Sequence, residues 1–193
     1  MQKQDKNNST TILKTSIEGV FKIERPTFED NRGFFHEVVR LDEIENVTGI
    51  KFSPVQWSHA LSNPRVIRAL HTEDWHKIIY PITGKMFAAI VDVRPDSATF
   101  MTVEEFIFDN TQESPHTALF LPPGIGNSIC VIGTGPVHYM YLVNEYWDNS
   151  KARGIAWDDP DLNINWPIEN PIISERDRNN PRLRDLYPHK FVK

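Results

Sequence analysis

Cysteine is almost absent from this chain of 193 residues, which contains only Cys130. A single cysteine excludes an internal disulfide and fits the reducing cytoplasm, where we expect the protein to act. Long apolar runs are also missing, since no stretch approaches the roughly 20 residues that a membrane helix needs. The polar first residues lack the apolar core of a signal peptide. We therefore expect neither secretion nor a membrane partner.

Basic charge is scarce as well. Lys and Arg number 21 against 26 Asp and Glu, which gives a net charge of -5, and no long basic run is present. This argues against nucleic acid as a partner, because proteins that bind it cluster their basic side chains. Hydrophobic residues make up 39% of the chain, as in a globular protein with one core. We expect a flexible polar tail over residues 1–14 and a single domain over residues 15–193.

Helical patterns are few, whereas 14 prolines and 9 glycines divide the chain into short apolar segments. Several of these segments are typical of strands bounded by turn residues, namely 19–28, 76–82, 86–95, 102–109, 116–124, 129–133 and 137–147. Many short strands at regular spacing predict an all-β sandwich or jelly roll. Short helices are expected at Leu41–Gly49 and near Arg182–Leu186. Residues 158–182, rich in Pro, Asn and Asp, are expected to wrap around the domain.

One segment concentrates chemically useful side chains. RALHTEDWHK, Arg68–Lys77, contains two cations and His71, and a distant SERD ends on Asp177. An imidazole base, a carboxylate to orient it and nearby cations are the groups needed to remove a proton beside a carbonyl. The residues therefore indicate proton-transfer chemistry on a carbonyl compound.

Several motifs occur in an order and spacing that resemble a known family. They are DNRGFFHE (30–37), QWSHALSNPRVIRALH (56–71), GKMFAAIVDVRPDSATF (84–100), LPPGIGNSI (121–129) and the WDDP…WP…SERD tail. Together they resemble the dTDP-4-dehydrorhamnose 3,5-epimerase family in its wider sense of nucleotide 4-keto-sugar epimerases. The resemblance runs from about residue 17 to about residue 179. It implies a cupin-like double-stranded β-helix, or jelly roll, with short peripheral helices and a homodimeric assembly.

The resemblance also implies catalytic roles. His71 matches the base, and Asp177 matches the carboxylate that holds the imidazole in the right tautomer. Lys77 matches a lysine beside the 4-keto oxygen, where an ammonium stabilises the enolate. Tyr141 matches a phenol on the opposite face that returns the proton.

Other residues match positions that contact the substrate. Arg68 and Arg176 suit a diphosphate, because a guanidinium bonds two oxygens at once. Further implied contacts come from the N-terminal motif, often across the dimer interface, and from the strands that line the pocket: Arg32, Phe35, Glu37, Gln56, Trp57, Ser58 and Asn127.

Metal-binding cupins usually supply an HxH pair, a Glu and a later His. Here His71, Glu73 and His76 lie near the right place, but HxH is absent and Asn127 falls where the last His would be. Because imidazole and carboxylate ligands must converge on one ion, this set makes a poor site. We expect no metal and no other cofactor.

The chain departs from the family pattern at several positions, including SATFM (97–101) in place of SPTFG. Ala69 and Ala88 replace a Gly and an acid, and Asn127 replaces a His. Trp57 replaces an Asn at a place expected to line the pocket. The GIGN turn and the SERD ending are more similar to relatives that act on GDP-linked 4-keto-6-deoxy-heptoses than to the rhamnose enzymes.

The expected function is epimerisation at carbon 3, carbon 5 or both in a nucleotide-diphosphate-linked 4-keto-6-deoxy sugar. Two alternatives stay open at this point. One is a single-position epimerase or a ketoisomerase that uses the same enediol chemistry. The other is a non-catalytic jelly roll that binds sugar nucleotides. The sequence leaves open whether the nucleotide is dTDP, GDP or CDP, and whether the sugar is a hexose or a heptose.

Overall fold

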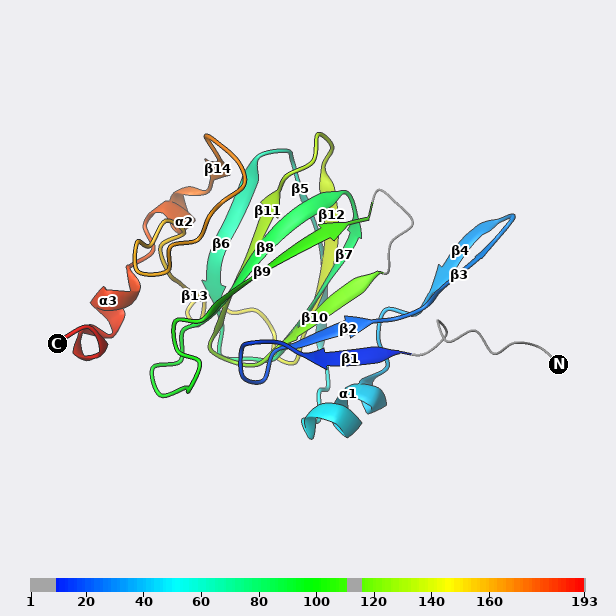
Figure 1. Cartoon of the computed structure of the whole chain (residues 1–193), viewed down its shortest axis with the longest axis horizontal. Helices are drawn as coiled ribbons and strands as arrows, with labels where there is room; N and C mark the ends of the chain where they lie inside the picture. The colour runs from blue at the N-terminus through cyan, green and yellow to red at the C-terminus, as the bar shows by residue number, and fades with distance from the viewer. Residues whose placement is uncertain (1–9, 111–115, 193) are drawn as a thin grey trace.

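The computed structural model describes residues 10–110 and 116–192, and most of its elements are strands. One sheet has the order β1 (Thr11–Lys14), β2 (Phe21–Glu24), β10 (Thr117–Leu121), β7 (Lys77–Thr83), β12 (Val137–Val143) and β5 (Gln56–Ser62). The second has the order β13 (Arg153–Gly154), β6 (Val66–Thr72), β11 (Ile125–Val131), β8 (Lys85–Asp92) and β9 (Val103–Asp109), and β14 (Ile172–Ile173) pairs in parallel with β6. The expected cupin-like jelly roll is confirmed (Figure 1).

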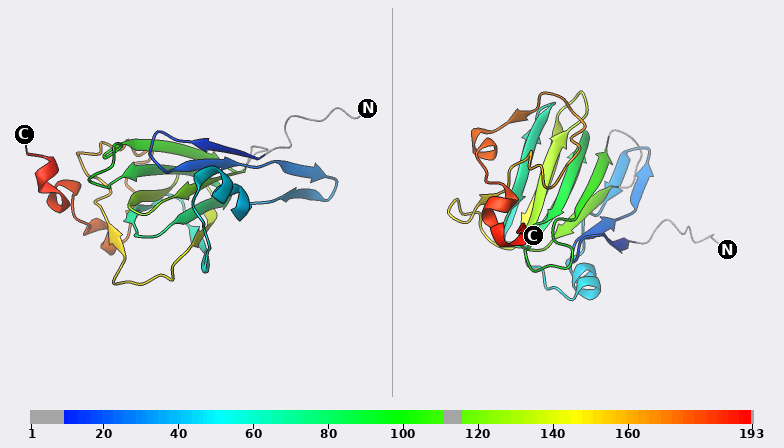
Figure 2. Two further views of the ribbon diagram at one scale, coloured as in Figure 1. Left: turned by 90° about the horizontal axis from the view of Figure 1, so that it is seen from below. Right: turned by 60° about the vertical axis from the view of Figure 1, so that its left-hand side comes forward.

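Three apolar clusters hold the layers together. The first lies between the sheets and includes Met86, Ile90 and Leu119, each fully buried. The second covers the outer face of the β6 sheet with apolar side chains of the C-terminal segment, such as Ile155 and Leu183. The views in Figure 2 show this segment along one side of the barrel. The third cluster packs α1 (Leu41–Thr48) against the outer face of the β7 sheet.

The two predicted helices are present. Helix α1 ends at Gly49, whose φ of 71° is the left-handed conformation common at helix C-termini. Helix α3 (Leu183–Leu186) lies within the second predicted range and precedes a 3-10 turn, η1 (Pro188–Lys190). Helix α2 (Glu175–Arg178) was not predicted. Ser174 caps it by accepting a hydrogen bond from the Asp177 N–H at 3.1 Å.

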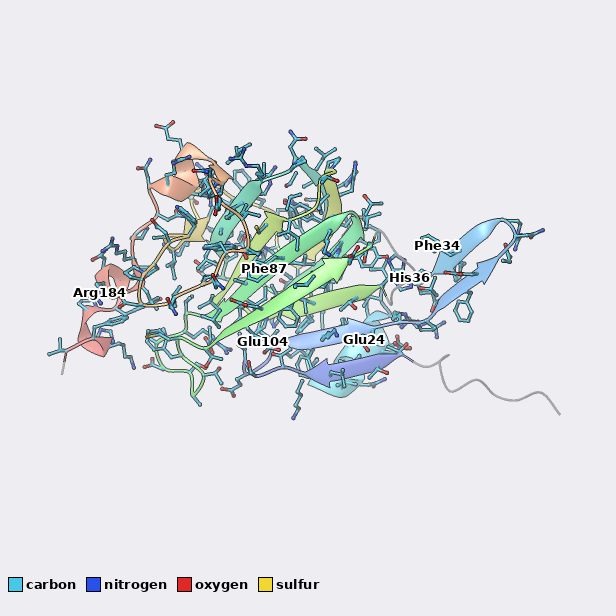
Figure 3. The ribbon with its side chains drawn as sticks, turned by 45° about the horizontal axis from the view of Figure 1, so that its top comes forward. Glu24, Phe34, His36, Phe87, Glu104 and Arg184 are labelled. Carbon is cyan, nitrogen blue, oxygen red and sulfur yellow. The ribbon has the colours of Figure 1, made fainter. Side chains whose placement is uncertain are left out.

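A hairpin of β3 (Thr27–Asp30) and β4 (Gly33–His36) forms a separate two-stranded sheet that projects from the barrel (Figures 1 and 2). Phe34 and Phe35 are 62% and 64% exposed on it. Figure 3 shows Phe34 and His36 on this hairpin. An exposed pair of phenylalanines on a projecting hairpin is typical of a contact surface.

Two sequence expectations need correction. Residues 11–14, placed in the tail, form β1 and pair with β2, while residues 1–9 lie outside the described part of the chain. Strands β5 and β6 were missing from the predicted set. Their inward positions are polar, at Gln56, Ser58 and His71 for example, so they lack the apolar run that marks a buried strand. Within the described residues, no helix is long and apolar enough to cross a membrane.

Candidate active site

A cavity opens between the two sheets at the end where β5, β6, β7, β11 and β12 meet. Its polar and charged lining residues are Gln56, Arg68, His71, Glu73, Trp75, Lys77, Asn127, Tyr139, Tyr141, Trp147 and Arg176. Ala60, Ile79, Ile129 and Val143 complete the wall. The cavity therefore gathers most of the predicted catalytic residues in one place.

A β-bulge in β6 brings Arg68 and His71 to the same wall. In a regular strand, residues three positions apart point to opposite faces. Here Arg68 pairs with Ile129 and His71 with Asn127, so three steps along β6 match two along β11. The extra residue turns both side chains into the cavity, while Ala69 and Leu70 pack into the apolar cluster behind. Bulges commonly re-aim side chains beside active sites in this way.

His71 is hydrogen-bonded to Asp177 through Nε2 and Oδ1 at 2.9 Å. Strand β14 pairs with the first residues of β6, and α2 follows it directly. The strand that carries His71 therefore also anchors the segment that carries Asp177. A carboxylate only accepts hydrogen bonds, so Nε2 carries the proton and the imidazole lone pair lies on Nδ1.

Asp177 is ionised despite being only 3% exposed. Burial raises its pKa, but the interaction with His71 and hydrogen bonds with Ser174 and the Ala69 backbone together lower that pKa more. The net pKa of Asp177 lies below its ordinary value. The His71 ring, whose side chain is 26% exposed, is thus held at the cavity wall by a buried anion.

Lys77, at the start of β7, forms an ion pair with Glu73 at 2.6 Å between Nζ and Oε2. Its ammonium also lies 5.5 Å from the centre of the Tyr141 ring. Asn127 donates from Nδ2 to the His71 carbonyl at 2.8 Å and to Glu73 Oε2 at 3.4 Å. The predicted base and the predicted lysine therefore belong to one connected polar wall.

Two tyrosines of β12 line the cavity from the same sheet as Lys77 and face the sheet that carries His71. Tyr139 and Tyr141 are two residues apart on one strand and both face the cavity. Burial raises the pKa of Tyr139, which is 6% exposed. Tyr141 is less buried and lies next to the lysine. The phenol required by the sequence prediction is present, with a second phenol beside it.

Arg68 and Arg176 add positive charge to the cavity. Edge strand β5 holds the Arg68 guanidinium, through the Ser62 hydroxyl at 2.9 Å and the Leu61 carbonyl at 3.3 Å. With Lys77, the described residues of the lining carry three cations against the single anion Glu73, in a chain of net charge -5. A local excess of positive charge of this kind favours anionic ligands.

The predicted pocket residues of β5 divide between its two faces. Gln56 lines the cavity, accepts from the Trp147 N–H at 2.8 Å and donates to Ser58 at 3.0 Å. Ser58 therefore supports Gln56 without reaching the cavity itself. Trp57 was expected to line the pocket, and this is wrong. It alternates with its inward neighbours and lies 70% exposed on the outer face of the sheet.

Three predicted nucleotide contacts lie away from this cavity. Arg32 pairs with Asp30 on the exposed β3–β4 hairpin, and Phe35 extends from β4. Glu37 is paired with Arg25 and, at 2.9 Å, with Arg40. Within one chain, none of these residues lines the cavity.

Besides the apolar wall, four polar or aromatic residues of the described cavity lining were not predicted as site members. Glu73 and Trp75 belong to the TEDWH segment between β6 and β7, and Trp147 follows β12. The indole N–H of Trp75 is buried without a hydrogen-bond partner among the described residues. The fourth, Tyr139, could have been found by alternation from Tyr141. No group of three or more His, Cys, Asp or Glu side chains is placed to hold a metal within the described ranges.

A family model described as dTDP-4-dehydrorhamnose 3,5-epimerase matches residues 14–185. This chain belongs to the dTDP-4-dehydrorhamnose 3,5-epimerase family. It is 31% identical over 178 residues to the enzyme of that name from Shigella flexneri, covering 90% of this chain and 96% of the relative. It is accordingly an isomerase of the epimerase class.

Solved structures of epimerases are also similar to this chain. The dTDP-6-deoxy-D-glucose-3,5-epimerase of Legionella pneumophila, in complex with dTDP-4-keto-L-rhamnose, is 25% identical with a TM-score of 0.85. The match covers 94% of this chain and 97% of that one. ChmJ of Streptomyces bikiniensis, a 3'-monoepimerase in complex with dTDP-quinovose, is 27% identical with a TM-score of 0.84 over 92% and 90% of the two chains.

Proposed function

We propose that this protein epimerises carbons 3 and 5 of a nucleotide-diphosphate-linked 4-keto-6-deoxy sugar. The observation that carries the proposal is the 2.9 Å pair of His71 and Asp177 in one cavity with Lys77 and Tyr141. This set contains a base, an electrophile and an acid, which are the groups that inversion beside a ketone needs.

In the proposed reaction, Nδ1 of His71 takes the proton from the carbon beside the ketone. The electron pair of the broken C–H bond moves into the carbonyl, and the oxygen becomes an enolate that the Lys77 ammonium stabilises. Tyr141 then donates its phenolic proton to the opposite face of the same carbon, which inverts it. Proton exchange with solvent returns both side chains to their starting state, so water hydrogen enters the product.

The diphosphate is assigned to the cations at the cavity. Arg68 and Arg176 carry forked donors suited to phosphate oxygens, and Arg68 is already held in place by β5. Relatives bound to dTDP-sugars support dTDP as the nucleotide.

We further propose a homodimer in which the β3–β4 hairpin of one chain reaches the nucleotide bound by its partner. Phe34 and Phe35 are exposed together there, beside Arg32. A phenylalanine could stack on the base, and an arginine could bond a phosphate or the sugar. This arrangement would use residues that a single chain leaves outside its own cavity.

Inversion at one position only is the second candidate, because one similar structure is a 3'-monoepimerase. Incubation with dTDP-, GDP- and CDP-linked 4-keto-6-deoxy sugars in D2O, followed by NMR, separates the candidates. Exchange at carbons 3 and 5 supports the proposal, and exchange at one carbon supports the second candidate. If none of the ring protons exchanges with any nucleotide, both fail and a non-catalytic binder remains.

A further inference from the structure

Glu73 is a charged cavity residue without a role in the reaction above. It lies in the five-residue segment 72–76, whose backbone is tied down where the Glu73 carbonyl accepts the Gly124 N–H at 3.0 Å. Gly124 itself has a φ of 75°, and a Cβ there would lie 2.6 Å from Arg94. The turn that contains Gly124, just before β11, therefore helps to fix the backbone position of Glu73 beside the cavity.

The Glu73 carboxylate faces the Lys77 ammonium, and both side chains are largely buried. Their side chains are only 14% and 9% exposed, and their charged atoms are 2.6 Å apart. A buried ammonium is costly unless a counter-charge meets it. Without Glu73, the Lys77 ammonium would lose its counter-charge and would turn away from its present position, so its charge would leave the cavity wall.

The same carboxylate oxygen contacts Asn127, which also bonds the backbone of His71. Glu73 therefore connects the lysine to the strand that carries the base. Ala88, where the family resemblance expects an acid, is instead buried in the apolar core. Segment 72–76 thus brings a carboxylate to the cavity from a different place in the chain.

We propose that Glu73 is a positioning residue that holds the Lys77 ammonium at the cavity wall and aimed at the substrate's keto oxygen. The inference rests on the proposed function, since it assigns Glu73 an effect only through Lys77. If Glu73 only stabilised the fold of segment 72–76, its replacement would affect folding and every kinetic parameter, whether or not Lys77 is present.

A double-mutant cycle tests this directly. Glu73→Gln, Lys77→Met and the double variant are compared for exchange and inversion, with kcat and KM measured separately. Asp74→Asn is the matched control, because it removes the next carboxylate of the same segment, which is exposed and 3.8 Å from Arg153. Thermal unfolding establishes that each variant is folded, and Glu73→Asp provides a conservative second substitution.

We expect Glu73→Gln to lower kcat about 10²-fold with little change in KM, because a misplaced Lys77 ammonium would no longer stabilise the enolate. Glu73→Asp should recover part of that loss, and Asp74→Asn should match the wild type. In the Lys77→Met background, Glu73→Gln should have no further effect. Multiplicative losses in the double variant would show independent action and overturn the inference, as would wild-type kcat in Glu73→Gln. Lack of exchange in the wild type would instead refute the proposed function itself.

Discussion

His71 and Asp177 are 106 residues apart in sequence, but Nε2 of His71 lies 2.9 Å from Oδ1 of Asp177. Strand β6 makes this possible, because it carries the histidine near its end and pairs at its start with β14, just before Asp177. The bulge in β6 then turns His71 toward the cavity. One strand thus determines both the position of the proposed base and that of its carboxylate.

Asp177→Asn should reduce exchange about 10²–10⁴-fold while substrate still binds, because an amide can hold the imidazole in the wrong tautomer. Exchange rates by NMR and binding by calorimetry provide the check. Glu175→Gln, on the exposed side of the same short helix, is the matched control. Wild-type exchange in Asp177→Asn would remove the carboxylate from the mechanism.

Tyr141→Phe should impair reprotonation more than deprotonation. Deuterium should still enter the substrate, while net inversion falls, because His71 can return a deuteron to the face from which it took the proton. Tyr139→Phe is the informative comparison, since it removes a hydroxyl from the same strand and the same cavity. If Tyr139→Phe, and not Tyr141→Phe, separates exchange from inversion, the acid is Tyr139.

Acidification should weaken the attachment of the β3–β4 hairpin. His36 and His116 lie with ring centres 4.8 Å apart beside Tyr80. Burial lowers the pKa of both histidines. For His36, a hydrogen bond with the Pro26 carbonyl opposes this shift, whereas the neighbouring His116 and Arg25 add to it. Burial also raises the pKa of Tyr80 to about 12, so its phenol stays neutral.

Both imidazoles are therefore neutral in the folded state at pH values where the unfolded chain already binds protons. Their contribution to stability is complete above about pH 6.5 and is lost as the pH falls through their lowered pKa values. Each group can reduce stability by at most about 1.4 kcal/mol per pH unit. Thermal unfolding across this range should show a shallower decline for His116→Phe than for the wild type. His189→Phe, in exposed η1, should decline like the wild type; an unchanged slope in His116→Phe would contradict the assignment.

The projecting hairpin should support both assembly and nucleotide binding. Phe35→Ser should weaken dimerisation in light scattering and weaken dTDP binding, because it removes an exposed ring from the proposed contact. Ile107→Ser, at a residue 68% exposed on β9, is a control of similar exposure. A fully active wild-type monomer at micromolar concentration would rule out the arrangement.

Much of the barrel was predictable because strands such as β8 and β10 are apolar and bounded by turn residues. Strand β5 was not, since its inward residues are selected for the cavity and not for the core. Trp57 was misplaced because its side chain was judged by motif position, although alternation with inward Gln56 requires it to face outward.

The site was predictable only where the family resemblance reached. No periodicity relates His71 to Asp177. Strict alternation along β6 would place Arg68 and His71 on opposite faces, and the bulge that brings them to the same face has no clear sequence signal. Glu73 was visible as an acid near the base, but its contact with Lys77 depends on how segment 72–76 folds back. Such contacts belong to tertiary structure and cannot be read from spacing.

The most direct test is the exchange of ring protons catalysed by wild type and His71→Asn in D2O, on whichever nucleotide-linked 4-keto-6-deoxy sugar the wild type accepts. Asn preserves a hydrogen-bonding side chain toward Asp177 but cannot act as a base. We predict exchange at carbons 3 and 5 with the wild type and a loss of about 10²–10⁴-fold at both carbons with His71→Asn, which should still fold and bind. Exchange by His71→Asn at a rate close to that of the wild type would contradict the account.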